Sequence, residues 1–156
     1  MAWVSIVPGS RRRPGTWVAQ ISESAHKVIH TYPYGVGTAI TAADPARGVV
    51  WMVIGDGVNA GMIEVIREST HRVVRTFDNV AVSANGIVID SRTKTVLAAG
   101  TNNRFVEISE ATGKILKTIK MNFFPTRPAV DQKTGNVYVP IAFRGFVAQF
   151  QLAPRR

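Results

Sequence analysis

The chain is patterned as short apolar runs, each followed by a cluster of turn-forming residues. Within residues 86–119 the runs are GIVID (86–90), TVLAAG (95–100), RFVEIS (104–109) and KILKTI (114–119). β-Branched and other apolar residues fill these runs, and Gly, Asn, Asp and Thr stand between them, which is typical of β-strands joined by tight turns. No stretch of eleven or more residues has helical periodicity. The pattern predicts an all-β protein built from four-stranded units.

The four-stranded unit recurs along the chain. The segments ISESAHKVIHTY (21–32), IRESTHRVVRTF (66–77) and ISEATGKILKTI (108–119) align with one another at spacings of 45 and 42 residues. Three aspartates at the ends of predicted first strands repeat at spacings of 46 and 41 residues: Asp44, Asp90 and Asp131. Four strands in roughly 42 residues is the period of a β-propeller blade. The sequence therefore predicts β-propeller blades.

The alignment also predicts where the blades begin and end. The first run, AWVSIV (2–7), aligns with a second strand, and the last run aligns with a third strand. We therefore expect two complete four-stranded blades flanked by two three-stranded partial blades, which together make a half-propeller. The expected blades, all within one domain spanning residues 1–156, are 1–33, 38–78, 85–120 and 127–156.

Two segments carry a resemblance to a known family. DQKTGNVYVP (131–140) and the turn EATGKILKTI (110–119) resemble the repeats of YVTN-type β-propellers, and the resemblance extends over nearly the whole chain. The Tyr-Val-Thr-Asn signature is Tyr-Val-Pro-Ile at residues 138–141. The resemblance implies a β-propeller fold. Such families include binding scaffolds, surface or periplasmic proteins and, in the related streptogramin-lyase group, enzymes.

Composition narrows the classes of function. The chain contains no cysteine, which excludes disulfides and thiolate metal sites. No apolar run is long enough for a transmembrane helix, and the first residues lack the pattern of a signal peptide. Related propellers are often periplasmic or extracellular.

The formal net charge of +9 allows an anionic partner. Part of this charge lies on the predicted fourth strands, which form the outer edges of propeller blades. These basic residues are Lys27, Arg72, Arg75, Lys117 and Lys120. Charged side chains on an exposed strand discourage edge-to-edge aggregation. We therefore expect much of the positive charge to be spread over a solvated surface.

Two of the three histidines occupy the same place in the repeat, which raises the possibility of a paired metal site. His26 and His71 both align with Gly113, in the turn between the third and fourth strands. Such turns need a residue in the left-handed region, where Gly is unstrained and His is enriched among other residues. We therefore predict that His26 and His71 are turn residues. His30 lies on a fourth strand without a His or carboxylate at a recognisable spacing, so we expect a structural role there.

The loops between second and third strands, and between fourth and first strands, are expected on one face of the propeller. Loops on a rigid scaffold are common binding sites, and several arginines there favour an anionic partner. The candidate binding residues are Arg11, Arg12, Arg13, Tyr34, Asp56, Asn59, Asn102, Asn103, Arg104, Arg127 and Arg144. Three aromatic residues of these loops are expected either at an interface or in loop packing: Phe123, Phe124 and Phe143.

These observations favour a non-catalytic scaffold or binding subunit. An open half-ring leaves apolar faces on its end blades, so we expect the ring to be completed by another copy or another chain. The basic loop face is then expected to bind a partner. The alternatives are a propeller that binds nucleic acid or another polyanion, and a lyase-type enzyme. The residues assemble no convergent His/Glu set, so the sequence assigns no catalytic residue, metal ligand or cofactor.

Overall fold

The computed structural model describes residues 2–6, 16–34, 38–55, 61–80, 84–100 and 103–152. Within these ranges the chain is all-β and forms four antiparallel sheets of three, four, four and three strands. The strands are β1 (Ala2–Ile6), β2 (Thr16–Ser22), β3 (Lys27–Tyr34), β4 (Thr38–Asp44), β5 (Val49–Gly55), β6 (Gly61–Arg67), β7 (Arg72–Val80), β8 (Ala84–Asp90), β9 (Thr95–Gly100), β10 (Arg104–Ser109), β11 (Ile115–Lys120), β12 (Ala129–Val130), β13 (Asn136–Ile141) and β14 (Phe146–Gln151).

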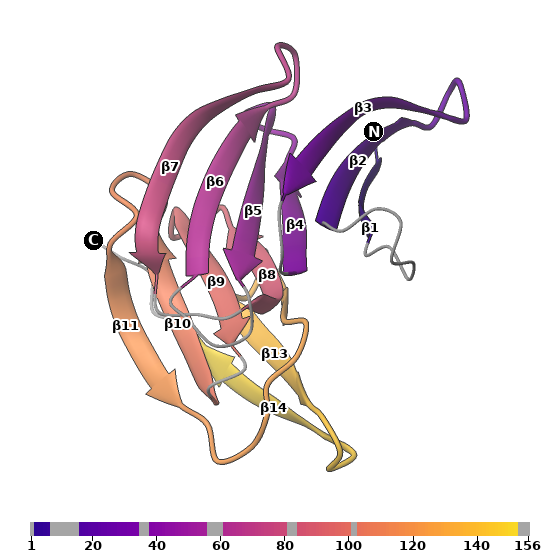
Figure 1. Ribbon diagram of the computed structural model, residues 1–156. Coiled ribbons are helices and arrows are strands. Elements are labelled where there is room, and N and C mark those ends of the chain that lie inside the picture. The colour runs from indigo at the N-terminus through magenta and orange to yellow at the C-terminus, as the bar shows by residue number, and fades with distance from the viewer. Residues whose placement is uncertain are drawn as a thin grey trace.

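Each sheet is a meander in which consecutive strands are neighbours, as in a propeller blade. We call β1–β3 the first blade, β4–β7 the second, β8–β11 the third and β12–β14 the fourth. The blades follow one another around an arc, and β4 and β8 lie side by side on its inner side (Figure 1). The predicted order of two complete blades between two partial blades is confirmed.

Burial differs between strands because of their place in the blade. All six residues of β9 are buried, since this second strand is covered by a blade on each side. The outer strand β11 is exposed at nearly every position, as its lysines predict. Buried and exposed residues alternate along β13 instead. Alternation means that one face is packed and the other is open, so the fourth blade is covered on one side only.

The hydrophobic cores lie between adjacent blades. Trp51 and Val65 of the second blade pack with Ile87 and Val96 of the third. The next core joins the third blade to the fourth in the same way, and a smaller one joins the first blade to the second. Burying one such side chain contributes about 1.5–3 kcal/mol. Neighbouring blades therefore stabilise one another, and a single blade has no core of its own.

The turns between third and fourth strands have the backbone conformation that the repeat predicts. His26, His71 and Gly113 have φ values of 49°, 55° and 70°, all in the left-handed region. The prediction that both histidines are turn residues is confirmed. The turns between first and second strands share a similar feature, because Gly48 and Lys94 both have a positive φ.

The repeated aspartates stabilise these turns. The Asp90 carboxylate accepts a hydrogen bond from the Arg92 amide at 3.0 Å. Asp131 accepts from the Lys133 amide at 2.8 Å and from the Thr134 hydroxyl at 2.6 Å. The Thr134 hydroxyl and the backbone amides lower the pKa of Asp131. The side chains of Asp90 and Asp131 therefore hydrogen-bond the backbone of the turn that follows their strand.

His30 has a partner that its spacing in the sequence does not reveal. Its ring stacks on the ring of His71 in the neighbouring blade, with centroids 4.8 Å apart. The Nδ1 atom of His71 lies 2.8 Å from Oε1 of the buried Gln20. No recognisable spacing connects the two histidines, because the stack joins two blades. The structural role expected for His30 agrees with this packing.

Tyr32 lies in the same contact between the first and second blades. Its ring stacks on Trp3, and its buried hydroxyl has no hydrogen-bond partner. Burial, with a smaller contribution from the charge of Glu68, raises the pKa of Tyr32 from 10.0 to about 12. The phenol therefore stays neutral in the folded protein at a pH where it ionises in the unfolded chain.

We expect the variant Tyr32→Phe to be as stable as the native chain at neutral pH, or more stable by up to about 1 kcal/mol, since it removes an unpaired buried hydroxyl. As pH rises from 10 to 12 the native chain loses stability, because only the unfolded state ionises there. At pH 11 the variant then gains about a further 1 kcal/mol over the native chain. Urea denaturation at pH 7 and pH 11 measures both effects. An equal pH dependence in the two proteins would contradict the assignment.

Candidate functional site

The fourth blade has an open apolar face. Tyr138, Pro140 and Val147 point to one side of it, because Pro140 pairs with Val147 across the ladder and Tyr138 lies two residues before Pro140. Tyr138 is 37% exposed and Val147 is 55% exposed. Large apolar side chains exposed together on one sheet face are a common feature of interaction surfaces. We call these three residues the open face.

The position of Tyr138 in its blade is informative. It is equivalent to Trp3, Trp51 and Leu97, which occupy the matching register in the other blades. Each of those three side chains packs against the blade that follows: Trp51 contacts the third blade and Leu97 the fourth. Tyr138 is therefore a blade-contact residue whose position, in every other blade of the chain, is covered by the next blade.

A second group of side chains lies where the third and fourth blades meet at the loop face. Arg104 lies opposite Lys120 in the ladder between β10 and β11, at the ends of these strands. Lys120 lines a surface hollow together with Phe123. The guanidinium of Arg144 lies over the ring of Phe123, 4.5 Å from its centroid, within the range of a cation–π interaction. Phe123 also meets the ring of Phe146 edge to face. We call these five residues the loop-face cluster.

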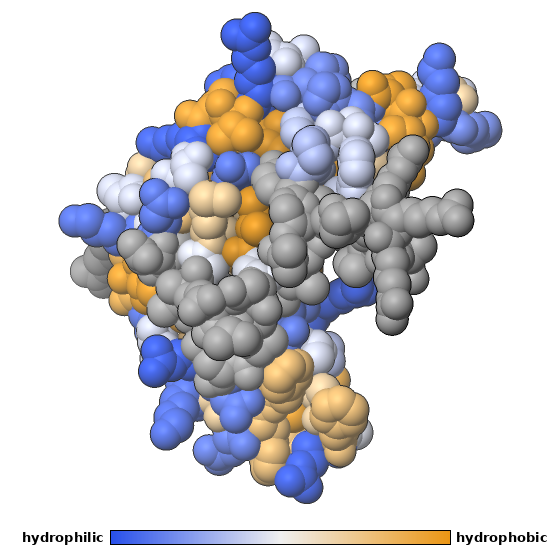
Figure 2. All heavy atoms as spheres, in the orientation of Figure 1, coloured by the Kyte–Doolittle hydropathy of each residue, from blue (hydrophilic) through white to orange (hydrophobic). Residues whose placement is uncertain are grey.

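The predicted aromatic residues of the loops divide into two kinds. Phe143 is 97% exposed at the tip of the β13–β14 hairpin, with a φ of 62°. Phe123 and Phe124 are partly buried, and Phe123 packs against the core between the third and fourth blades. Hydrophobic residues reach the surface over this hairpin beside strongly hydrophilic ones (Figure 2). Basic and aromatic side chains therefore lie together on this part of the surface.

The structure brings together only part of the predicted loop set. Arg104 and Arg144 belong to the loop-face cluster. Arg127 is exposed and lines a different hollow, between β1, β4 and β8. Asn103 has a φ of 57°, and its carbonyl accepts a hydrogen bond from the Met121 amide, so it shapes the turn.

The remaining candidates cannot be placed. Arg11, Arg12, Arg13, Asp56, Asn59 and Asn102 lie outside the described residues, as does the side chain of Tyr34. Sequence reasoning missed Lys120, because it was attributed to the outer strand. Its place beside the loop at residues 121–128 was the signal that could have found it.

The described residues also bear on metal binding and on membrane spanning. Within that part of the chain, no group of three or more His, Cys, Asp or Glu side chains is arranged to hold a metal ion. The same ranges contain no helix long and apolar enough to span a membrane.

Comparison with known proteins identifies the fold. No family model matches the sequence, and no curated protein matches it either. In structure the chain is similar to a chain of Kuenenia stuttgartiensis hydrazine synthase, a β-propeller-containing protein, with a TM-score of 0.69 and 14% identity. The match covers 86% of this chain and 40% of that chain. At this identity the likeness establishes a β-propeller-like fold and no activity.

Proposed function

We propose that this chain is a non-catalytic β-propeller scaffold that associates with further blades through its open face. The added blades come from a second copy or from another chain and complete the ring. The basic loop face, with the loop-face cluster, then binds an acidic protein partner. The observation that carries the proposal is the exposure of Tyr138 and Val147 at a blade-contact surface.

The internal repeats support this mode of association. The chain contains three contacts between successive blades, and in each of them a large side chain equivalent to Tyr138 packs on the following blade. The first blade presents the opposite face, on which the exposed Val4 lies beside Ala19. A blade of a second copy docked there would repeat a contact that the chain already makes. Burial of apolar surface would stabilise the assembly.

The mass of the protein in solution tests the proposal. We expect sedimentation equilibrium of residues 1–156 to give a multiple of the 17.0 kDa chain mass. A charge at the centre of the open face must be desolvated on association, so Val147→Glu is expected to weaken self-association by at least about a hundredfold. Raising the salt concentration should leave the native association unchanged or strengthen it, because the contact is apolar.

The matched control is Val73→Glu. Val73 is also about half exposed, but it lies on the outer strand β7 of the second blade, away from the open face. This variant is expected to associate like the native chain. A stable, fully folded monomer of the native chain would contradict association with a second copy. Equal weakening by both variants would show that the open face is not the contact.

A further inference from the structure

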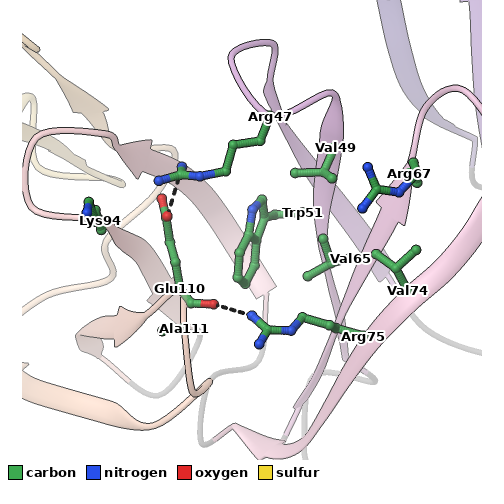
Figure 3. Close-up of a pocket in the computed structure, with 10 residues that line it drawn as sticks. All are labelled: Arg47, Val49, Trp51, Val65, Arg67, Val74, Arg75, Lys94, Glu110 and Ala111. Atoms are coloured by element: carbon green, nitrogen blue, oxygen red, sulfur yellow. Dashed lines mark hydrogen bonds and ion pairs between the residues drawn. The ribbon is translucent and has the colours of Figure 1, made fainter.

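A pocket between the second and third blades is separate from both surfaces described above. It has a volume of about 380 Å³, within the range of small-molecule sites. Trp51 lies at its centre, Glu110 on one side and Val74 on the other (Figure 3). Three arginines, Arg47, Arg67 and Arg75, surround the apolar side chains of the pocket. The guanidinium of Arg67 points into the pocket.

Two buried polar atoms in the pocket lack hydrogen-bond partners. Trp51 is 3% exposed and Glu110 is 7% exposed, yet Nε1 of Trp51 and Oε1 of Glu110 are both unpaired. A buried polar group without a partner is costly. An unpaired donor and an unpaired acceptor therefore belong to two side chains that line the same cavity.

In the contact between the first and second blades, the residues equivalent to Trp51 and Glu110 form a hydrogen bond with each other. There Nε1 of Trp3 donates to Oε1 of Glu68 at 3.0 Å. Trp3 is equivalent to Trp51, and Glu68 is equivalent to Glu110. Between the second and third blades this hydrogen bond is absent, and the pocket opens where it would form. The unpaired atoms are therefore a local departure from the repeat.

Arg47 explains the departure. Its Nη1 atom lies 2.8 Å from Oε2 of Glu110 and 2.6 Å from the Asp44 carboxylate, so it holds the Glu110 side chain in the turn region. Arg75 donates to the Glu110 carbonyl at 2.9 Å and so fixes the backbone of the same residue. Burial raises the pKa of Glu110, although Arg47 opposes the shift. The side chain and the backbone of Glu110 are thus both fixed by arginines beside the cavity, and Oε1 is left without a partner.

The charges around the pocket favour a ligand with a single negative charge. Arg67 and Lys94 also line it, and neither makes a side-chain ion pair within the described part of the chain. Glu110 repels a second negative charge near itself, so the anionic end of a ligand is expected at the Arg67 side. The valine and tryptophan side chains between these ends favour an aromatic body.

We propose that this pocket binds a small planar aromatic carboxylate that also carries a hydroxyl group. The carboxylate pairs with Arg67, and the aromatic body packs between Trp51 and Val74. The hydroxyl donates to Oε1 of Glu110, and the Trp51 N–H donates to an oxygen of the ligand. This binding is independent of the association of blades proposed above.

The probe for this site is 6-hydroxy-2-naphthoate, titrated into ¹⁵N-labelled protein. The indole N–H resonance of Trp51 is assigned with Trp51→Phe and followed in correlation spectra, with that of Trp3 as an internal reference. We expect saturable shifts of the Trp51 resonance with a Kd below about 1 mM. 2-Naphthoate lacks the hydroxyl and 6-hydroxy-2-naphthamide lacks the charge. Each should bind about tenfold more weakly, since each loses one charge-assisted hydrogen bond.

Variants test the position of the carboxylate. Arg67→Met keeps most of the apolar stem and is expected to weaken binding of 6-hydroxy-2-naphthoate about tenfold. Arg72→Met is the control, because it removes the same charge from the neighbouring strand at a residue that does not line the pocket. The proposal is overturned if Trp51 does not respond up to about 10 mM probe. Equal binding of the naphthamide, or equal weakening by the two variants, would also overturn it.

Discussion

Replacing Gly86 by alanine is expected to destabilise the protein by about 3 kcal/mol, near the upper end for overpacking a core. Gly86 lies on the inner strand β8, where the segment leading into β12 crosses it. A Cβ atom at this residue would lie 2.5 Å from Cα of Arg127 and 2.6 Å from Cδ of Pro128. Neither is the flexible end of a side chain, so the backbone at residues 127–128 would have to move. The third and fourth blades would then lose part of their contact.

Chemical denaturation of Gly86→Ala and Gly48→Ala measures this effect against a matched control. Gly48 has a φ of 60°, but no atom lies within 4 Å of a Cβ placed there. Its replacement is expected to cost only about 1 kcal/mol, from the left-handed conformation alone. Similar midpoints for the two variants would mean that the close approach at Gly86 relaxes freely.

Gly113→Ala is expected to destabilise the protein by about 2–5 kcal/mol, from two sources that add. The φ of 70° costs a residue with a Cβ atom about 1–2 kcal/mol. The new Cβ would also overlap the ring of Phe77, and such overpacking costs about 1–3 kcal/mol. Phe77 cannot move away easily, because it stacks on Trp51 with ring centroids 5.9 Å apart.

A double-mutant cycle with Phe77→Leu separates the two sources. If the overlap is real, Gly113→Ala should cost about 1 kcal/mol less in the Phe77→Leu background than in the native one. His26→Gly, at the equivalent turn of the first blade, provides the comparison. It is expected to change stability by less than about 1 kcal/mol, since relief of strain is offset by the freedom of glycine in the unfolded chain. Additive effects in the cycle would contradict the overlap.

The turn residues show what can be predicted without coordinates. His26, His71 and Gly113 occupy one position of the repeat, and a left-handed backbone there depends only on local turn geometry. The strands of each blade follow from the same local pattern. Their order in each sheet follows from the short turns, which make consecutive strands neighbours.

The candidate sites could not be predicted from the sequence in the same way as the turns, because these sites lie between blades. The loop-face cluster combines Arg104 and Lys120 of the third blade with Arg144 of the fourth. The relative rotation of two blades decides whether these side chains meet, and no single repeat contains that information. The stack of His30 on His71 was missed for this reason.

The sequence by itself determined the all-β class, the blade period, the partial first and last blades and the turns that need a left-handed residue. These features depend on alternation, on short loops and on backbone conformation, which are local properties repeated several times. Only the tertiary structure decided that Arg47 holds Glu110 away from Trp51, and that Tyr138 is exposed where Trp51 and Leu97 are covered. Such contacts join side chains of different blades, so their formation depends on packing distances and rotamers that the repeat does not encode.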